Sequence, residues 1–201
     1  MRIAGGEWRG RALKAPPGDM LRPTQDRVRE ALFSMLMHET PGARFLDLFA
    51  GVGGVGLEAL SRGAAECTFV ELAPRHLAFL RANVSALAAE ARCHLVRADA
   101  YAWLETFEGA PFDVAFADPP YELGVEKGYA SVLATLAVRN VVKPGGLFVS
   151  ELTARQTPEE SPLWDLCRDR TYGQTRLAVY RRAHSALRPL DVREHLPPPV
   201  L

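Results

Sequence analysis

The stretch from Arg44 to Leu60 constrains the fold of this chain most, because an apolar run there breaks into glycines and then becomes helix-like. Around Asp47 the run predicts a strand buried on both faces, built from Phe45, Leu46, Leu48 and Phe49. A turn that lets backbone approach a ligand is predicted by Gly51, Gly53, Gly54 and Gly56. A helix should follow over Val55–Arg62 and stop at Gly63. This order predicts a nucleotide-type pocket at the carboxyl end of a parallel strand.

The rest of the chain alternates between strands and helices. Further strands are expected at 67–72, 94–100, 112–117 and 147–152; further helices are expected from Thr24 as N-cap to Pro41, from about Pro74, and over 127–138. The alternation predicts a mostly parallel sheet with helices on both faces. Residues 161–167 are expected to form a weak helix, and 170–182 an antiparallel edge hairpin.

Length and composition bound the domain organisation. The chain has 201 residues, 48% of them hydrophobic, and can bury one substantial core. We expect that core in a domain over residues 24–183. Residues 1–23 are rich in Arg, Gly and Pro and should form a basic arm or hairpin on this domain, whereas the prolines of residues 184–201 predict an irregular tail.

Charge and cysteine content exclude several classes of protein. Lys plus Arg and Asp plus Glu both number 24, so the net charge indicates no acidic or basic partner. Cys67, Cys93 and Cys167 lack C-x-x-C spacing and the five histidines lack metal-ligand spacing, so neither a disulfide framework nor a metal site is expected. A cytoplasmic protein is expected, since no signal peptide or membrane-spanning run is apparent.

The glycine turn alone leaves two kinds of enzyme open. Residues 51–56 satisfy G-x-G-x-x-G, and Glu71 follows Gly51 by 20 positions, which is the dinucleotide-binding pattern. An acidic residue that ends the second strand binds ribose hydroxyls in nicotinamide-dependent dehydrogenases and in methyltransferases alike. The turn therefore predicts a nucleoside-containing cofactor without naming it.

Two aspartates favour a methyltransferase. Asp47 lies inside an apolar strand, where a buried carboxylate needs hydrogen-bond donors; the ammonium of a methionine moiety would supply them, whereas a dinucleotide pyrophosphate would be repelled. Asp99 ends the third predicted strand, where its carboxylate or a neighbouring backbone group can bind the amine of adenine. Alternatively, Asp47 is a core carboxylate that binds no ligand and accepts its hydrogen bonds from backbone N–H groups.

The strongest indication of a methyltransferase is the sequence Asp118-Pro119-Pro120-Tyr121 at the end of the fourth predicted strand. An exocyclic base amine is a poor nucleophile because its lone pair is delocalised into the ring. Acceptors at the Asp118 side chain and the Pro119 carbonyl would draw that nitrogen toward tetrahedral geometry and aim its lone pair at the methyl group of S-adenosylmethionine. The two prolines stiffen the loop, and Tyr121 offers a face for a flipped-out base.

Four segments together resemble a known family, the RsmD-type methyltransferases, over about residues 1–183. They are L-R-P-T-Q-D-R-V-R-E-A-L-F at 21–33, L-D-L-F-A-G-x-G at 46–53, E-A-L-S-R-G-A at 58–64 and D-P-P-Y at 118–121. The resemblance implies a seven-stranded class I methyltransferase fold with an antiparallel last strand, S-adenosyl-L-methionine as cofactor, and methylation of the N2 amine of a guanine in 16S ribosomal RNA. Val52 replaces an expected serine, so one hydroxyl contact to the cofactor would be missing.

The pattern and the resemblance together define the expected site. Catalytic residues are Asp118, Pro119, Pro120 and Tyr121. Cofactor-binding residues are Asp47, Phe49, Ala50, Gly51, Gly53, Gly54, Glu71, Leu72, Asp99, Ala100 and Asp118. RNA-binding residues are Arg2, Arg9, Arg11, Arg22, Thr24 and Arg27, although exposed arginines are also common without any ligand.

The expected partner is 16S ribosomal RNA within an assembled or assembling small subunit. The chain is expected to act as a monomer and to have no membrane partner. A DNA adenine-N6 methyltransferase with the same D-P-P-Y loop, a dehydrogenase, and an RNA-binding module with a vestigial pocket remain alternatives.

Overall fold

The computed structural model describes residues 1–17, 23–119 and 121–184, without the side chains of 23–25 and 121–128. Its strands form one seven-stranded sheet in the order β3-β2-β1-β4-β5-β7-β6. The first five in this order are parallel, and β7 pairs antiparallel with both β5 and β6. The strands are β1 Arg44–Leu48, β2 Glu66–Glu71, β3 Cys93–Arg97, β4 Phe112–Ala117, β5 Val142–Thr153, β6 Trp164–Tyr172 and β7 Thr175–Arg182.

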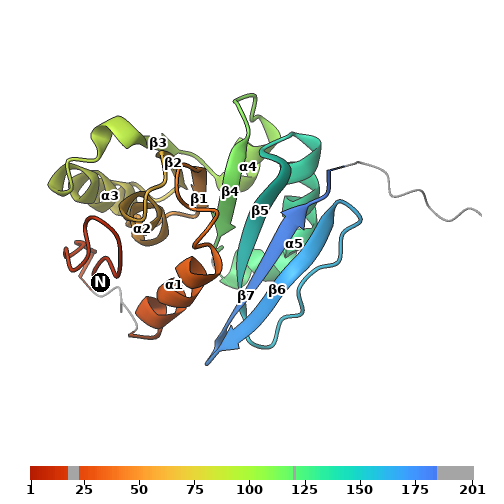
Figure 1. Cartoon of the computed structure of the whole chain (residues 1–201). Helices are drawn as coiled ribbons and strands as arrows, with labels where there is room; N and C mark the ends of the chain where they lie inside the picture. Colours follow the sequence, from red (N-terminus) through yellow and green to blue (C-terminus); the bar gives the residue numbers. More distant parts are fainter. Residues whose placement is uncertain (18–22, 120, 185–201) are drawn as a thin grey trace, which may run out of the picture.

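Helices cover both faces of the sheet, as the alternation predicts (Figure 1). The helices are α1 Pro23–Met35, α2 Gly54–Ser61, α3 Pro74–Ala86, α4 Ala100–Glu105 and α5 Tyr121–Val138, with a short 3-10 turn at Glu90–Arg92. Alternate strand residues enter two separate cores: Phe45 packs with α1, α2 and α3, whereas the next residue, Leu46, packs with α4 and α5. Because both faces of the central strands are buried, residues of both alternating sets are apolar, and the strands appear in the sequence as continuous apolar runs. Within the described residues no helix is long and apolar enough to span a membrane.

Several helices and strands differ from those expected from the sequence. The weak helix expected at 161–167 is wrong, because β6 begins at Trp164 and pairs along β7; exposed, charged side chains at this edge hide the strand pattern. The third strand ends at Arg97 rather than at Asp99, which instead N-caps the unpredicted α4 by accepting the N–H of Ala102.

Other helix ends and one strand also differ. Helix α1 begins at Pro23, so Thr24 lies in the first turn instead of at the N-cap, and it ends at Met35, before Pro41. Helix α5 begins at Tyr121 instead of 127. Strand β5 begins at Val142, and a register shift against β4 absorbs the Pro-Gly-Gly turn that had been expected to precede the strand.

The N-terminal arm is a hairpin held by a buried carboxylate. Arg2 and Ala12 form an antiparallel bridge, and Ile3 and Leu13 enter the core on the α2 side of the sheet. Glu58 on α2 is fully buried and accepts four donors: the N–H groups of Ala4 and Gly5, both at 2.8 Å, and the Nε atoms of Arg29 and Arg62 at 3.3 and 2.7 Å. One side chain therefore fastens the arm and α1 to the glycine-turn helix.

Candidate active site

Five carboxylates lie along one edge of the sheet, where the parallel strands β1 to β5 end. They are Asp99, Glu71, Asp47, Asp118 and Glu151, in the spatial order β3, β2, β1, β4 and β5. Leu48 pairs with Ala117, and Ala117 pairs with Ser150, so Asp118 and Glu151 directly follow paired residues of neighbouring strands. The chain leaves β1 toward β2 but reaches β4 on the other side, and this change of direction is where open α/β sheets bind ligands.

The glycine turn after β1 is shaped as the sequence predicts. Gly51 and Gly53 have φ of 55° and 88°, and Phe49 also lies in the left-handed region with φ of 60°. A Cβ on Gly56 would lie 2.3 Å from Cε1 of Phe69, so only glycine lets α2 approach the sheet this closely. The turn brings the N–H of Gly56 to 2.8 Å from Oδ2 of Asp47.

Asp47 and Glu71 hold this turn in place. Burial raises the pKa of Asp47 to about 7, and the charges of Glu71 and Asp118 add to the rise, while the hydrogen bond from Gly56 opposes it. Glu71 accepts the N–H of Gly51 and the N–H of Ala73, both at 2.7 Å. The acidic residue that ends β2 therefore connects the glycine turn to the start of α3.

A cavity of about 590 Å³ lies over the ends of β1, β2 and β3. Its walls are mainly apolar, with Glu71, Asp99 and Asp118 as acidic groups. The ring of Phe49 packs edge-on against Tyr101 at 5.5 Å between centroids. The lining residues are Phe49, Gly51, Val70, Glu71, Leu72, Ala73, Pro74, His76, Arg97, Ala98, Asp99, Ala100 and Asp118. Its shape and chemistry fit a nucleoside: an apolar slot for a base, and carboxylates for hydroxyl or amine donors.

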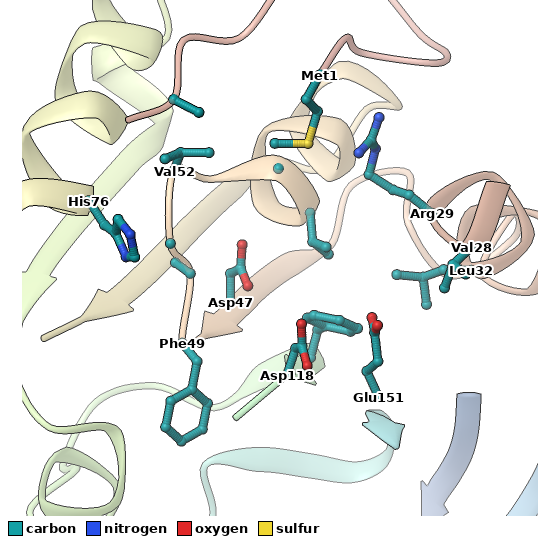
Figure 2. A pocket seen from close by; sticks show the side chains of 16 residues that line it. Met1, Val28, Arg29, Leu32, Asp47, Phe49, Val52, His76, Asp118 and Glu151 are labelled. Atoms are coloured by element: carbon teal, nitrogen blue, oxygen red, sulfur yellow. The ribbon is translucent and has the colours of Figure 1, made fainter. Parts of the chain in front are cut away.

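A second cavity of about 300 Å³ joins the first at Phe49, Gly51, His76 and Asp118. Figure 2 shows the carboxylates of Asp47, Asp118 and Glu151 directed into it, with Arg29 and Met1 at the opposite wall. The guanidinium of Arg29 is buried and binds Glu58, Asp26 and the Arg2 carbonyl. The arm and α1 thus form one wall of this cavity.

Asp118 and Glu151 line the same cavity, and both have raised pKa values. Burial raises the pKa of Asp118 to about 6; for Glu151, burial first and then the charge of Asp118 raise the pKa to about 8. Asp118 nevertheless stays accessible from the cavity. Two adjacent carboxyl groups with raised pKa values, aimed into a cleft, are typical of a functional site.

The structure gathers most of the predicted cofactor and catalytic residues. The two cavities contain Asp47, Phe49, Ala50, Gly51, Gly54, Glu71, Leu72, Asp99, Ala100 and Asp118. Gly53 is buried at the start of α2 and shapes the turn without lining either cavity. Pro119 lines a small recess behind Asp118. Pro120 lies outside the described residues, and Tyr121 is described only as the first residue of α5.

The predicted RNA-binding residues are only partly described. Arg2, Arg9, Arg11 and Arg27 are exposed, whereas Arg22 and the side chain of Thr24 lie outside the described part. Arg2 and Arg11 donate to the carbonyls of Gly10 and Ala86, so part of their hydrogen-bonding capacity is used within the protein.

Sequence reasoning missed several residues that line the second cavity, among them Met1, Arg29, His76 and Glu151. Glu151 had a detectable signal, because it is an acidic residue at the end of the fifth predicted strand, as Glu71 is at the end of the second. Arg29 and Met1 had none, since their place depends on how the arm and α1 fold back.

The sheet order, with an antiparallel β7 between β5 and β6, and the ligand cavity beside β1 define a methyltransferase of the class I fold. The chain belongs to the RsmD-type family: a family model described as "Conserved hypothetical protein 95" matches residues 1–181. It is 35% identical over 191 residues to the ribosomal RNA small subunit methyltransferase D of Escherichia coli, with 90% of each chain covered.

Further relatives support the same family assignment. The ribosomal RNA small subunit methyltransferase D of Haemophilus influenzae is 34% identical over 184 residues, which cover 90% of this chain and 93% of the relative. A solved structure of Escherichia coli yhhF, which carries a provisional methyltransferase assignment, superimposes with a TM-score of 0.80 at 35% identity and covers 92% of this chain and 99% of its own. The family match removes the dehydrogenase alternative.

Proposed function

We propose that this protein transfers a methyl group from S-adenosyl-L-methionine to the exocyclic N2 amine of a guanine in 16S ribosomal RNA. The observation that carries the proposal is the place of Asp118, at the junction of the nucleoside-shaped cavity and the second cavity. The names of the relatives support ribosomal RNA of the small subunit as the substrate class. The choice of guanine N2 rests on the resemblance of the Asp118–Tyr121 loop and of the 21–33 segment.

The residues present fit the cofactor in three parts. Asp99 and Ala100, with Leu72 and Phe49, would hold the adenine; Glu71 would accept from the ribose; and Asp47, Ala50, Gly51, Gly53 and Gly54 would surround the methionine end. Glu71 still has acceptor capacity after its two backbone bonds, since each carboxylate oxygen accepts more than one donor. When bound, the cofactor supplies an electrophilic methyl group on a sulfonium, which needs no further activation by the protein.

The work of the protein is then to position the amine. The Asp118 carboxylate and the Pro119 carbonyl accept the two N–H groups of the guanine amine and aim its lone pair toward the cofactor cavity. Because an RNA base cannot reach this cleft while stacked, the guanine is flipped out, and Tyr121 stacks on it. Asp118 is also placed to take the released proton, and its raised pKa of about 6 makes it a better base than an ordinary aspartate.

The substrate side is formed by the arm and α1. Arg2, Arg9, Arg11, Arg22, Thr24 and Arg27 bind RNA backbone, and four of these side chains are exposed in the described structure. This is a small footprint for selecting one guanine, so the substrate is an assembled or assembling small subunit whose proteins present the RNA. The enzyme acts as a cytoplasmic monomer, and residues 1–23, 24–183 and 184–201 serve as arm, methyltransferase domain and tail.

Methyl transfer with nucleoside analysis tests the proposal. Labelled S-adenosyl-L-methionine is offered with unmodified small subunits, with naked 16S ribosomal RNA and with duplex DNA. We expect N2-methylguanosine from the subunits, and much less from naked RNA. N6-methyladenine from DNA would replace the substrate assignment, and cofactor and RNA binding without any transfer would indicate a vestigial pocket.

A further inference from the structure

Glu151 lies on the side of Asp118 away from the nucleoside-shaped cavity. In the sheet, β3, β2 and β1 carry the groups that line the nucleoside-shaped cavity, β4 carries Asp118, and β5 carries Glu151. Glu151 does not line that cavity. It lines the second cavity together with Asp118, and also the recess that contains Pro119, Thr153 and Gln156. Glu151 therefore lines the same spaces as Asp118 and Pro119, the two residues proposed to hold the amine.

The side chains of Asp118 and Glu151 have no hydrogen-bond donor among the described residues. The hydroxyl of Tyr129 donates to the backbone carbonyl of Glu151 at 2.6 Å and ties β5 to α5, but it leaves the carboxylate of Glu151 without a donor in the described part of the chain. Arg29, the buried cation at the opposite wall, is already bound to Glu58, Asp26 and a backbone carbonyl. Asp118 is exposed to the cavity and Glu151 is half-buried, so both carboxylates are free to accept donors that a ligand brings.

The Watson–Crick edge of guanine presents such donors side by side. Its N2 amine has two N–H groups, and the adjacent N1 carries one more; adenine has an amine but presents a lone pair at N1. We propose that Glu151 accepts the N1–H of the target guanine while Asp118 and Pro119 hold its N2 amine, so that Glu151 determines specificity for guanine over adenine. The inference rests on the proposed function and deepens it.

Electrostatics support this division of roles. Asp47 on β1, Asp118 on β4 and Tyr129 on α5 are the titratable groups that couple to this end of the cavity, with His76 on α3 and Arg29 on α1 also in its wall. Burial and the charge of Asp118 keep the pKa of Glu151 at about 8 without ligand. A bound N1–H favours the ionised carboxylate, whereas the N1 lone pair of adenine repels it, so the selectivity for guanine should increase as Glu151 ionises.

The test compares guanine with 2-aminopurine, which keeps the 2-amine but has a lone pair at N1. Unmodified small subunits are assembled from RNA that carries either base at the methylated position, and kcat/KM is measured for wild type, Glu151→Gln and Glu151→Leu. Cofactor affinity is measured by calorimetry for each. Glu160→Gln, an exposed glutamate in the loop before β6, is the matched control.

Above the pKa of Glu151, at about pH 8.5, we expect wild type to prefer guanine by about a hundredfold or more, because an N1 without hydrogen leaves the ionised carboxylate facing a lone pair. In Glu151→Gln the preference should fall at least tenfold, since an amide can donate to that lone pair. In Glu151→Leu, transfer to guanine should fall about a hundredfold. Cofactor affinity should stay within about twofold in both, and Glu160→Gln should match wild type.

An unchanged guanine preference in Glu151→Gln, with wild type still forming N2-methylguanosine, would overturn the role of Glu151 alone. A loss of cofactor affinity as large as the loss of transfer would also overturn it, because Glu151 would then bind the methionine end. Absence of N2-methylguanosine from wild type would overturn the proposed function and this inference together.

Discussion

Replacing Glu58 by Gln should loosen the arm and reshape the cavity that the arm helps to form. Oε1 of Glu58 accepts the N–H of Gly5 and Nε of Arg62, and Oε2 accepts the N–H of Ala4 and Nε of Arg29. An amide has only one accepting oxygen. Whichever way the glutamine is oriented, its NH2 group faces two donors that lose their acceptor.

The magnitude follows from this count. A buried donor without a partner costs about 1–3 kcal/mol, so two give about 2–6 kcal/mol. The lower part of the range applies, because Arg62 is partly exposed and Arg29 keeps its bonds to Asp26 and the Arg2 carbonyl. We expect a loss of about 2–3 kcal/mol in the free energy of unfolding, measured by urea denaturation.

Hydrogen exchange then locates the effect. The amides of Ile3, Gly10 and Leu13 form the hairpin bonds of the arm and should exchange about 30- to 150-fold faster in the variant, which is the same energy expressed as an opening equilibrium. Glu30→Gln, an exposed glutamate on α1, serves as control. A loss below about 0.5 kcal/mol, or an arm whose exchange is unchanged, would refute the view that Glu58 fastens the arm.

Four further outcomes follow from the same structure. Asp118→Ala should abolish methyl transfer while cofactor affinity, measured by calorimetry, stays near normal; full activity would remove the proposed positioning of the amine. Gly56→Ala should lower the free energy of unfolding in urea by about 1–3 kcal/mol, because the new Cβ would lie 2.3 Å from Phe69. The free energy of unfolding of the cofactor-free protein should fall as pH rises from about 4 to about 8. The reason is that Asp47, Asp118 and Glu151 have raised pKa values in the folded state, so the unfolded chain releases their protons at lower pH. In Asp47→Asn this fall should be smaller by roughly 2–4 kcal/mol, measured by denaturation at a series of pH values. Replacing Arg2, Arg9 and Arg11 by Ala should weaken RNA binding and reduce its salt dependence by up to about 3 units of slope, and an unchanged slope would exclude the arm from the interface.

The positions of the residues proposed to bind the cofactor were predictable because local sequence determines them. Asp47, the glycine turn and Glu71 come from one strand-turn-helix-strand unit, in which the apolar period and the glycines specify both the fold and the place of each carboxylate. The carboxyl ends of parallel strands then bring these groups to one edge without any need to know side-chain packing. The loop at Asp118 was found in the same way, from its place after a buried strand.

The parts that sequence missed depend on contacts between distant segments. Arg29 enters the cavity wall only because Glu58 and the arm hold it there, across 29 positions of sequence. The strand β6 escaped detection because it lies at the sheet edge, where charged residues replace the apolar alternation. Asp99 was expected to end a strand, but its side chain caps α4. An aspartate can occupy either position, and the apolar periodicity of the sequence does not distinguish between them.

Hydrogen bonding separates the five carboxylates into two groups, and this division is informative about chemistry. Asp47, Glu71 and Asp99 each accept at least one backbone N–H, so the protein has already fixed their direction, which suits the cofactor-binding role proposed for them. Asp118 and Glu151 accept no hydrogen bond at their side chains from the described residues, and both have raised pKa values. A group that must bind a substrate and release it cannot be satisfied by the protein beforehand. The boundary between the two groups falls between β1 and β4, which is where methyl donor and acceptor would have to meet.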